Sequence, residues 1–125
     1  MNKFQKLSDT EMELMSIIWE LNKKVTSAEL LEIVEKEKDK KWSGQTISTF
    51  LSRMVEKGVL TYDKKGRTNY YIATVTIEEY RQKEAESILN DMYKGSIKKF
   101  LSALYHGKKM NKEEIDDLKE WFSDK

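Results

Sequence analysis

Residues that do covalent or metal chemistry are scarce in this chain of 125 residues. It has no cysteine and one histidine, His106, so a thiolate nucleophile or cysteine-bound zinc is excluded and a histidine site would depend on one ring. His106 lies in a polar stretch typical of an exposed surface. Acidic residues occur as adjacent pairs, which do not face each other on a helix. We therefore predict no enzyme, no catalytic residue, no metal site and no cofactor.

A different chemistry is offered by short polar residues that follow Trp42. Groups that both donate and accept hydrogen bonds gather here, and an arginine follows them: Ser43, Gln45, Thr46, Ser48, Thr49 and Arg53. An amide can pair with adenine at two points, and a threonine methyl can contact the methyl group of thymine. The intervening apolar residues, from Ile47 to Met54, fall at helical spacing. A helix that buries them turns the polar groups outward.

Positive charge is concentrated around this polar run, although the net charge of the whole chain is only +1. Residues 36–71 contain nine Lys and Arg but four Asp and Glu. Lys64, Lys65 and Arg67 lie in segment 63–68, between two segments rich in β-branched and aromatic residues, 59–62 and 69–75. This pattern predicts a β-hairpin whose loop forms a cationic tip. On charge alone, the alternative that these lysines only solvate loops stays open.

Helix-start signals divide the chain into elements. Ser8, Thr26 and Asn111 each precede a glutamate by three residues, which is the spacing of a capping box, and Ser43 and Thr76 are further N-caps. Gly58, Gly95 and Gly107 stand where helices end. We predict a mainly α protein with a small β-hairpin wing. A winged helix-turn-helix domain spans residues 1–75, and a three-helix region spans residues 76–125.

The second half has more bulky apolar side chains than three short helices can bury among themselves. They are Ile88, Leu89, Met92, Ile97, Phe100, Leu101, Leu104, Ile115, Leu118, Trp121 and Phe122, and Tyr80 is assigned to the same stripe. We predict that a second copy of the chain covers this surface, which makes the protein a homodimer. The alternative is that these helices pack back onto the winged helix of the same chain.

Several stretches resemble a known family. Residues 7–15 with 17–19 are similar to its first helix, and residues 42–49 with 51–54 to its recognition helix; Lys57-Gly58, Tyr70-Tyr71 and residues 92–95 also match. The family is the penicillinase repressors, the BlaI/MecI type of transcriptional regulator. The resemblance implies a homodimer that represses β-lactam resistance genes, or other promoters, from operator DNA with inverted half-sites of the TACA/TGTA type. It also implies DNA contacts at Gln45, Thr46, Ser48, Thr49 and Arg53, and wing contacts at Lys65 and Arg67.

The resemblance further implies a route of induction. A membrane-bound β-lactam sensor with a zinc-protease domain triggers cleavage of the repressor at an Asn-Phe bond in the dimerisation region. Aligned through Tyr93-Lys94-Gly95, that bond falls at Ala103-Leu104, where no Asn-Phe pair stands. Either a different dipeptide is cut or induction takes another route. A copper-responsive branch has a C-terminal cysteine cluster, and thiolate sensing is excluded here because cysteine is absent.

Location and partners follow from the same patterns. No apolar run reaches the roughly 18 residues of a membrane span, and Met1 to Leu7 lacks the apolar core of a signal peptide. We expect a cytoplasmic protein that binds double-stranded DNA and does not insert into membranes. Because winged helices also serve as protein-interaction modules, such a module without specific DNA affinity is the alternative. The salt dependence of binding separates the two hypotheses.

Overall fold

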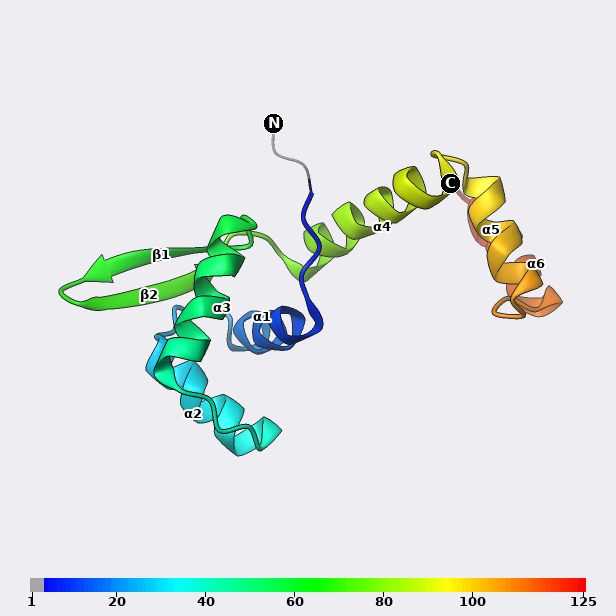
Figure 1. Cartoon of the computed structure of the whole chain (residues 1–125). Helices are drawn as coiled ribbons and strands as arrows, with labels where there is room; N and C mark the ends of the chain where they lie inside the picture. Colours follow the sequence, from blue (N-terminus) through cyan, green and yellow to red (C-terminus); the bar gives the residue numbers. More distant parts are fainter. Residues whose placement is uncertain (1–3) are drawn as a thin grey trace. The chain divides into compact units, whose positions relative to one another are not determined.

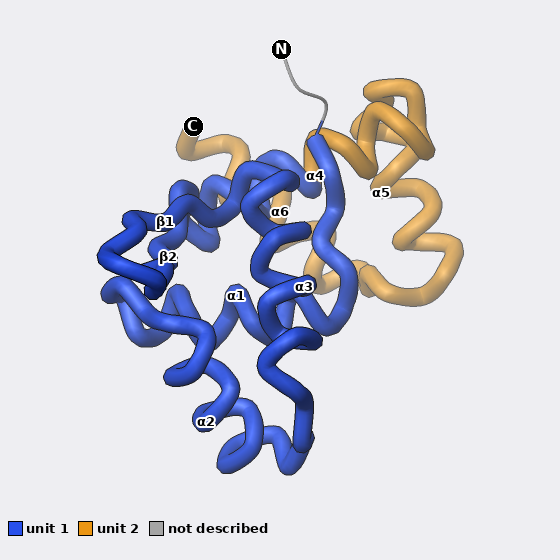
Figure 2. The backbone as a smooth tube through the Cα atoms, turned by 60° about the vertical axis from the view of Figure 1, so that its left-hand side comes forward, with its two compact units in different colours: residues 1–84 blue, residues 85–125 orange. Residues whose placement is uncertain are grey.

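The computed structural model describes residues 4–125, so residues 1–3 of the polar N-terminal stretch lie outside the described residues. The elements follow in the order α1 (Asp9–Leu21), α2 (Ser27–Lys38), α3 (Gly44–Glu56), β1 (Leu60–Lys65), β2 (Thr68–Ala73), α4 (Ile77–Tyr93), α5 (Ile97–His106) and α6 (Lys112–Ser123) (Figure 1). This order confirms the predicted fold class. The chain forms two compact units, unit 1 (residues 1–84) and unit 2 (residues 85–125), which divide within α4 (Figure 2).

The helix-start signals read from the sequence are in place. In the capping box of α1, the Ser8 hydroxyl accepts from the Glu11 N–H at 3.2 Å, and the Glu11 carboxylate accepts from the Ser8 N–H at 2.8 Å. Thr26 and Asn111 form the same reciprocal pairs at the starts of α2 and α6. Thr76 and Glu79 do so at the start of α4. Local side-chain bonds thus satisfy backbone donors that a helix start leaves free.

The core of unit 1 lies between α1, α2, α3 and the hairpin. Its fully buried side chains include Leu14 and Met15 from α1, Leu30 from α2, and Ile47 and Leu51 from α3. The connection between α1 and α2 adds a third, short strand-like contact, because Val25 and Tyr71 exchange backbone hydrogen bonds of 2.9 and 2.7 Å. These contacts fix the helices and the base of the hairpin as one body.

The hairpin differs from the prediction in the length of its loop. The segment 63–68 was expected to be a loop, which is wrong: antiparallel pairing continues to Lys65 opposite Thr68, leaving a two-residue turn of Gly66 and Arg67. Gly66 has φ +64°, and a glycine at this first turn position allows the tightest hairpin connection. Lys64 is therefore a strand residue. The hairpin projects beyond the helices of unit 1 (Figure 1).

Tyr80 also departs from its predicted place. It was assigned to the apolar stripe of the second half, but its side chain is only 3 % exposed and belongs to the core of unit 1. Its hydroxyl accepts a hydrogen bond of 2.9 Å from the backbone N–H of Leu7. The reason is that the first turns of α4 pack as part of unit 1. The boundary between the units falls after residue 84, whereas the hydrophobic pattern of the sequence already changes at residue 75.

Glu11 is a buried carboxylate that the sequence did not reveal. It is 2 % exposed and accepts a hydrogen bond of 2.6 Å from the Lys57 ammonium, which also donates to the Lys6 carbonyl at 2.9 Å. Burial alone raises the pKa of Glu11, but the hydrogen bond from Lys57, those from Ser8 and the charge of Lys57 together outweigh burial and lower the pKa. Glu11 is therefore held ionised inside unit 1.

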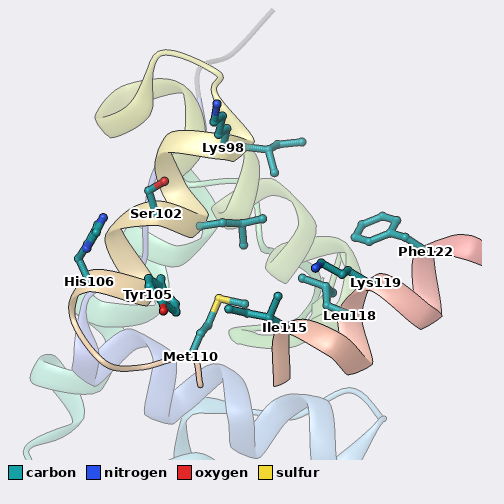
Figure 3. Close-up of a pocket in the computed structure, with 11 residues that line it drawn as sticks. Lys98, Ser102, Tyr105, His106, Met110, Ile115, Leu118, Lys119 and Phe122 are labelled. Carbon is teal, nitrogen blue, oxygen red and sulfur yellow. The ribbon is translucent and has the colours of Figure 1, made fainter. Parts of the chain in front are cut away.

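Unit 2 comprises the end of α4 with α5 and α6. None of its residues, all of which the structure describes, is buried. Ile88, Met92, Ile97, Trp121 and Phe122 are exposed, while Leu89, Phe100, Leu101, Leu104, Ile115 and Leu118 are half-buried. Apolar side chains from α5 and α6 line a groove of about 680 Å³ (Figure 3). Across residues 4–125, no helix combines the length and the apolar character needed to cross a membrane.

Candidate nucleic-acid interface

The polar run after Trp42 occupies the first turns of α3. Ser43 caps the helix, and its hydroxyl accepts a hydrogen bond of 3.1 Å from the Thr46 N–H. Ile47 and Leu51 on the opposite face have no exposed surface. Burial of this apolar face leaves Gln45 and the other polar groups on the outer side, as helical geometry requires.

The outer face of α3 presents polar groups of different availability. Gln45 and Ser48 are exposed, and their side chains make no hydrogen bond to any other residue between 4 and 125. Thr49 is exposed, and its hydroxyl donates to the Gln45 carbonyl at 2.9 Å, which leaves its methyl and lone pairs free. Thr46 is half-buried and its hydroxyl lies 3.0 Å from that of Ser43. Thr46 therefore faces outward less than predicted, because it takes part in the cap.

Arg53 lies at the far end of the same helix in an aromatic and cationic row. Its guanidinium lies 5.9 Å from the centre of the Phe50 ring, which in turn lies 5.4 Å from the Trp42 ring. The Lys40 ammonium lies 5.6 Å from the Trp42 ring and 3.1 Å from the Glu13 carboxylate. The sequence indicated Phe50 only as a core residue. Its half-buried ring also supports Arg53 through a cation–π contact.

The hairpin supplies exposed positive charge. Lys64, Lys65 and Arg67 are exposed and have no ion-pair partner among residues 4–125, and the Lys65 ammonium lies 5.7 Å from the Tyr70 ring. The acid of this hairpin, Asp63, is instead paired with Lys24 from the connection between α1 and α2. The hydrogen bond from Lys24, assisted by its charge, lowers the pKa of Asp63. The distal end of the hairpin is therefore cationic.

These features together define a class of protein. A helix-turn-helix whose second helix begins with exposed polar groups fits the major groove, where the first turns of a recognition helix contact base edges. A cationic hairpin in the same unit is suited to contacts with the phosphate backbone. Unit 1 is a winged helix-turn-helix domain of the DNA-binding kind.

The chain belongs to the penicillinase repressor family, whose model matches residues 7–124. The penicillinase repressor of Bacillus licheniformis is 30 % identical over 118 residues, which are 94 % of this chain and 90 % of that protein. The methicillin resistance regulatory protein MecI of Staphylococcus aureus (strain N315) is 27 % identical over 118 residues, 94 % of each chain.

A solved structure supports the same assignment. The solution structure of the DNA-binding domain of the repressor BlaI matches with a TM-score of 0.54 and 32 % identity, over 64 % of this chain and 94 % of that one. The chain is thus a DNA-binding repressor of the BlaI/MecI type, from a family of transcriptional repressors and not of enzymes.

The predicted cleavage position lies inside a helix. Ala103 is exposed and Leu104 is half-buried, and both stand within α5. A protease needs an extended backbone, so this bond becomes accessible only when α5 opens locally.

Proposed function

We propose that the protein is a homodimeric repressor that binds an operator made of two inverted half-sites. The first turns of α3 enter the major groove, and Lys64, Lys65 and Arg67 contact the phosphate backbone. The observation that carries the proposal is the polar row of α3 in one unit with a cationic hairpin. Gln45, Thr46, Ser48 and Thr49 read base edges, with Ser43 as the cap and Arg53 as a phosphate contact.

Dimerisation through unit 2 is supported by its lack of a buried core. A stable unit needs buried apolar surface, yet every residue from 85 to 125 keeps some exposure. The groove between α5 and α6 is lined by Ile97, Leu101, Ile115, Leu118 and Phe122, among others (Figure 3). A second copy, which presents the same apolar faces, completes this core in a two-fold arrangement.

Leu101→Asp tests the dimer directly. A carboxylate in the groove disfavours burial against the partner, so we expect a shift toward monomer and weaker operator binding. Light scattering at micromolar concentration measures the mass, and a gel-shift titration measures the affinity. Wild-type protein with the mass of one chain contradicts the dimer. Unchanged operator affinity in Leu101→Asp contradicts the link between dimerisation and binding.

DNA recognition is tested with two labelled duplexes, a palindrome of TACA/TGTA-type half-sites and its scrambled version, at two salt concentrations. We expect tight binding to the palindrome alone, about tenfold weaker in Gln45→Ala because a good base contact is worth about 1–3 kcal/mol. Ser48→Ala should weaken binding, while Ser16→Ala, a change of another exposed helix serine on α1, should not. Equal binding to both duplexes means a different operator. No binding at low salt refutes the proposal.

Regulation is proposed to follow the family's route. In this proposal the chain represses genes of β-lactam resistance in the cytoplasm, where the chromosome lies, and a membrane-bound sensor protease leads to its cleavage near Ala103-Leu104. The support is the family membership and the absence of buried residues in unit 2, which makes local opening of α5 less costly. Mass spectrometry of the chain from producing cells treated with a β-lactam should show a fragment ending near residue 103. A chain that stays intact while transcription rises refutes cleavage.

A further inference from the structure

The segment before α1 is bound to the first turns of α4. The Leu7 N–H donates to the Tyr80 hydroxyl at 2.9 Å, although the two residues are 73 positions apart. Leu7 is 4 % exposed and Tyr80 is 3 % exposed. A hydrogen bond between two groups this well buried is costly to lose, because each would then be left without water or a partner.

Two aromatic contacts of Tyr80 accompany this bond. The Tyr80 ring lies 5.4 Å from the ring of Phe4 and 6.0 Å from that of Trp19 on α1. The Trp19 indole N–H donates to the Val75 carbonyl at 2.8 Å, two residues before α4 begins. We call Phe4, Leu7, Trp19 and Tyr80 the N-terminal clamp.

Polar contacts fix the segment itself. The half-buried Lys57 side chain donates through its ammonium to the Lys6 carbonyl at 2.9 Å. Lys6 and Glu84 come within 4.0 Å, but the exposed Lys6 side chain makes this ion pair a minor contribution. The clamp is thus anchored to the ion pair Lys57–Glu11 on one side and to α4 on the other.

The clamp acts on a helix that both units share. α4 runs without a break from Ile77 to Tyr93, while the units divide after Glu84. The groups proposed to contact DNA lie on α3 and the hairpin, outside this clamp. The contacts between residues 4–7 and Tyr80 therefore hold the first turns of α4 on unit 1, and a looser start of α4 matters most where two copies are joined.

We propose that the N-terminal clamp is a positioning device for operator recognition. It holds the first turns of α4 on the winged helix, so that the two copies of a dimer grip half-sites at one separation and one rotation. This inference rests on the proposed function, because it requires a dimer on a two-part operator. Phe4, Leu7, Trp19 and Tyr80 contact no DNA in it and act through the geometry of α4.

The physical gain is in effective concentration. A second domain tethered flexibly binds at an effective concentration of the order of millimolar, and a tether fixed in the right geometry raises it. Each added base pair rotates a half-site by about 34° around the DNA axis, since the duplex repeats every 10–10.5 base pairs. Two winged helices held in a fixed geometry lose affinity when a half-site is rotated in this way, whereas winged helices that can pivot on α4 lose less.

The test uses the full chain and four duplexes: a single half-site, the intact palindrome, and palindromes with the spacing lengthened by one or two base pairs. Phe4→Ala removes one ring from the clamp, and Tyr80→Phe removes only the hydroxyl. Gln82→Ala, an exposed change on the same helix, is the control. Light scattering follows the dimer in each variant.

For wild type and Gln82→Ala we expect one strongly preferred spacing. In Phe4→Ala and Tyr80→Phe, affinity for the intact palindrome should fall about tenfold and half-site affinity should stay within about twofold. Their spacing preference should flatten while the dimer persists.

Three results overturn the inference while leaving the proposed function intact. They are an equal fall on the half-site and the palindrome, loss of the dimer, or an unchanged spacing preference in both clamp variants. If wild type does not distinguish the palindrome from scrambled DNA, the proposed function fails and this inference fails with it.

Discussion

Lys57→Met removes the cation that pairs with the buried Glu11 of unit 1 and keeps most of the side-chain volume. In the wild-type protein the Lys57 ammonium lies 2.6 Å from the Glu11 carboxylate, which is 2 % exposed. After the substitution, the carboxylate keeps the bond from the Ser8 N–H at 2.8 Å but loses its counter-charge. The perturbation therefore leaves an uncompensated charge inside the core.

The expected loss can be worked from this geometry. Removing one partner of a buried ion pair typically costs 3–5 kcal/mol. The Lys57 side chain is 22 % exposed, so some water reaches the site and the low end applies, about 3 kcal/mol. For a domain of 60–100 residues, each kcal/mol shifts the melting temperature by about 4–8 °C, so the shift is roughly 12–24 °C.

The assay must report on unit 1 alone. The Trp19 indole N–H, bonded to the Val75 carbonyl, gives an NMR resonance that belongs to this unit. Urea titrations at pH 7, followed by this resonance, give the free energy of unfolding of wild type, Lys57→Met and Lys57→Met/Glu11→Gln. Glutamine keeps the capping bond to Ser8 and removes the charge. The double variant should therefore recover most of the lost stability.

Acid provides the second part of the test. The pKa of Glu11 is lowered in the folded protein from its usual value of 4.5. Its ionisation thus contributes stability above pH 4.5, and this contribution is lost as the pH falls through the folded pKa. In Lys57→Met, burial without the cation favours the protonated acid, so the penalty shrinks as the pH falls from 7 toward 4. A penalty below about 1 kcal/mol at pH 7, or a double variant as unstable as the single one, refutes the reasoning.

Three further predictions follow from other contacts. Arg53→Gln should lower the slope of log affinity against log salt by roughly 0.9, because one phosphate contact is lost; an unchanged slope in a salt titration removes Arg53 from the backbone contacts. Gly66→Ala should lower the free energy of unfolding, measured in thermal melts, by about 1 kcal/mol because Gly66 has φ +64°. Gly44→Ala is the control and should cost nothing, because Gly44 is helical and a Cβ there meets no other atom. Equal losses of stability in the two variants contradict the turn assignment. Burial, with the charges of Glu84 and Glu11, raises the pKa of Tyr80 above 10.0 despite the bond from Leu7. The stability that the neutral Tyr80 hydroxyl contributes is therefore present below pH 10 and is lost as the pH rises through the folded pKa. In urea titrations from pH 8 to 11, the free energy of unfolding should fall less in Tyr80→Phe than in wild type, and an identical fall in both would contradict this.

The predictions that came out of the sequence depend on local signals. Ser8, Thr26, Ser43 and Asn111 cap helices with bonds that reach only three residues along the chain. The exposed face of α3 follows from its apolar spacing in the same way. Such features are complete within one turn of helix, so the order of residue types is enough to predict them.

What the sequence did not reveal depends on distant pairs. Glu11 fits the capping pattern of an exposed residue, and only Lys57, 46 positions away, explains its burial. Tyr80 fits an apolar stripe, and its actual partner is a backbone N–H 73 positions away. The two-residue turn at Gly66 was missed because the polar residues beside it are typical of a loop. They remain polar in the strands because that part of the hairpin lies outside the core.

In the proposed function the two faces of α3 have separate roles, and this has a consequence for how specificity evolves. Ile47, Leu51 and Met54 supply the folding energy of the helix, while Gln45 and Ser48 contribute almost no packing. Substitutions at the outer positions are therefore nearly free in stability. A lineage, or a designer, can change the recognised base sequence step by step on an unaltered scaffold. Related repressors with one architecture can thus come to control different sets of genes.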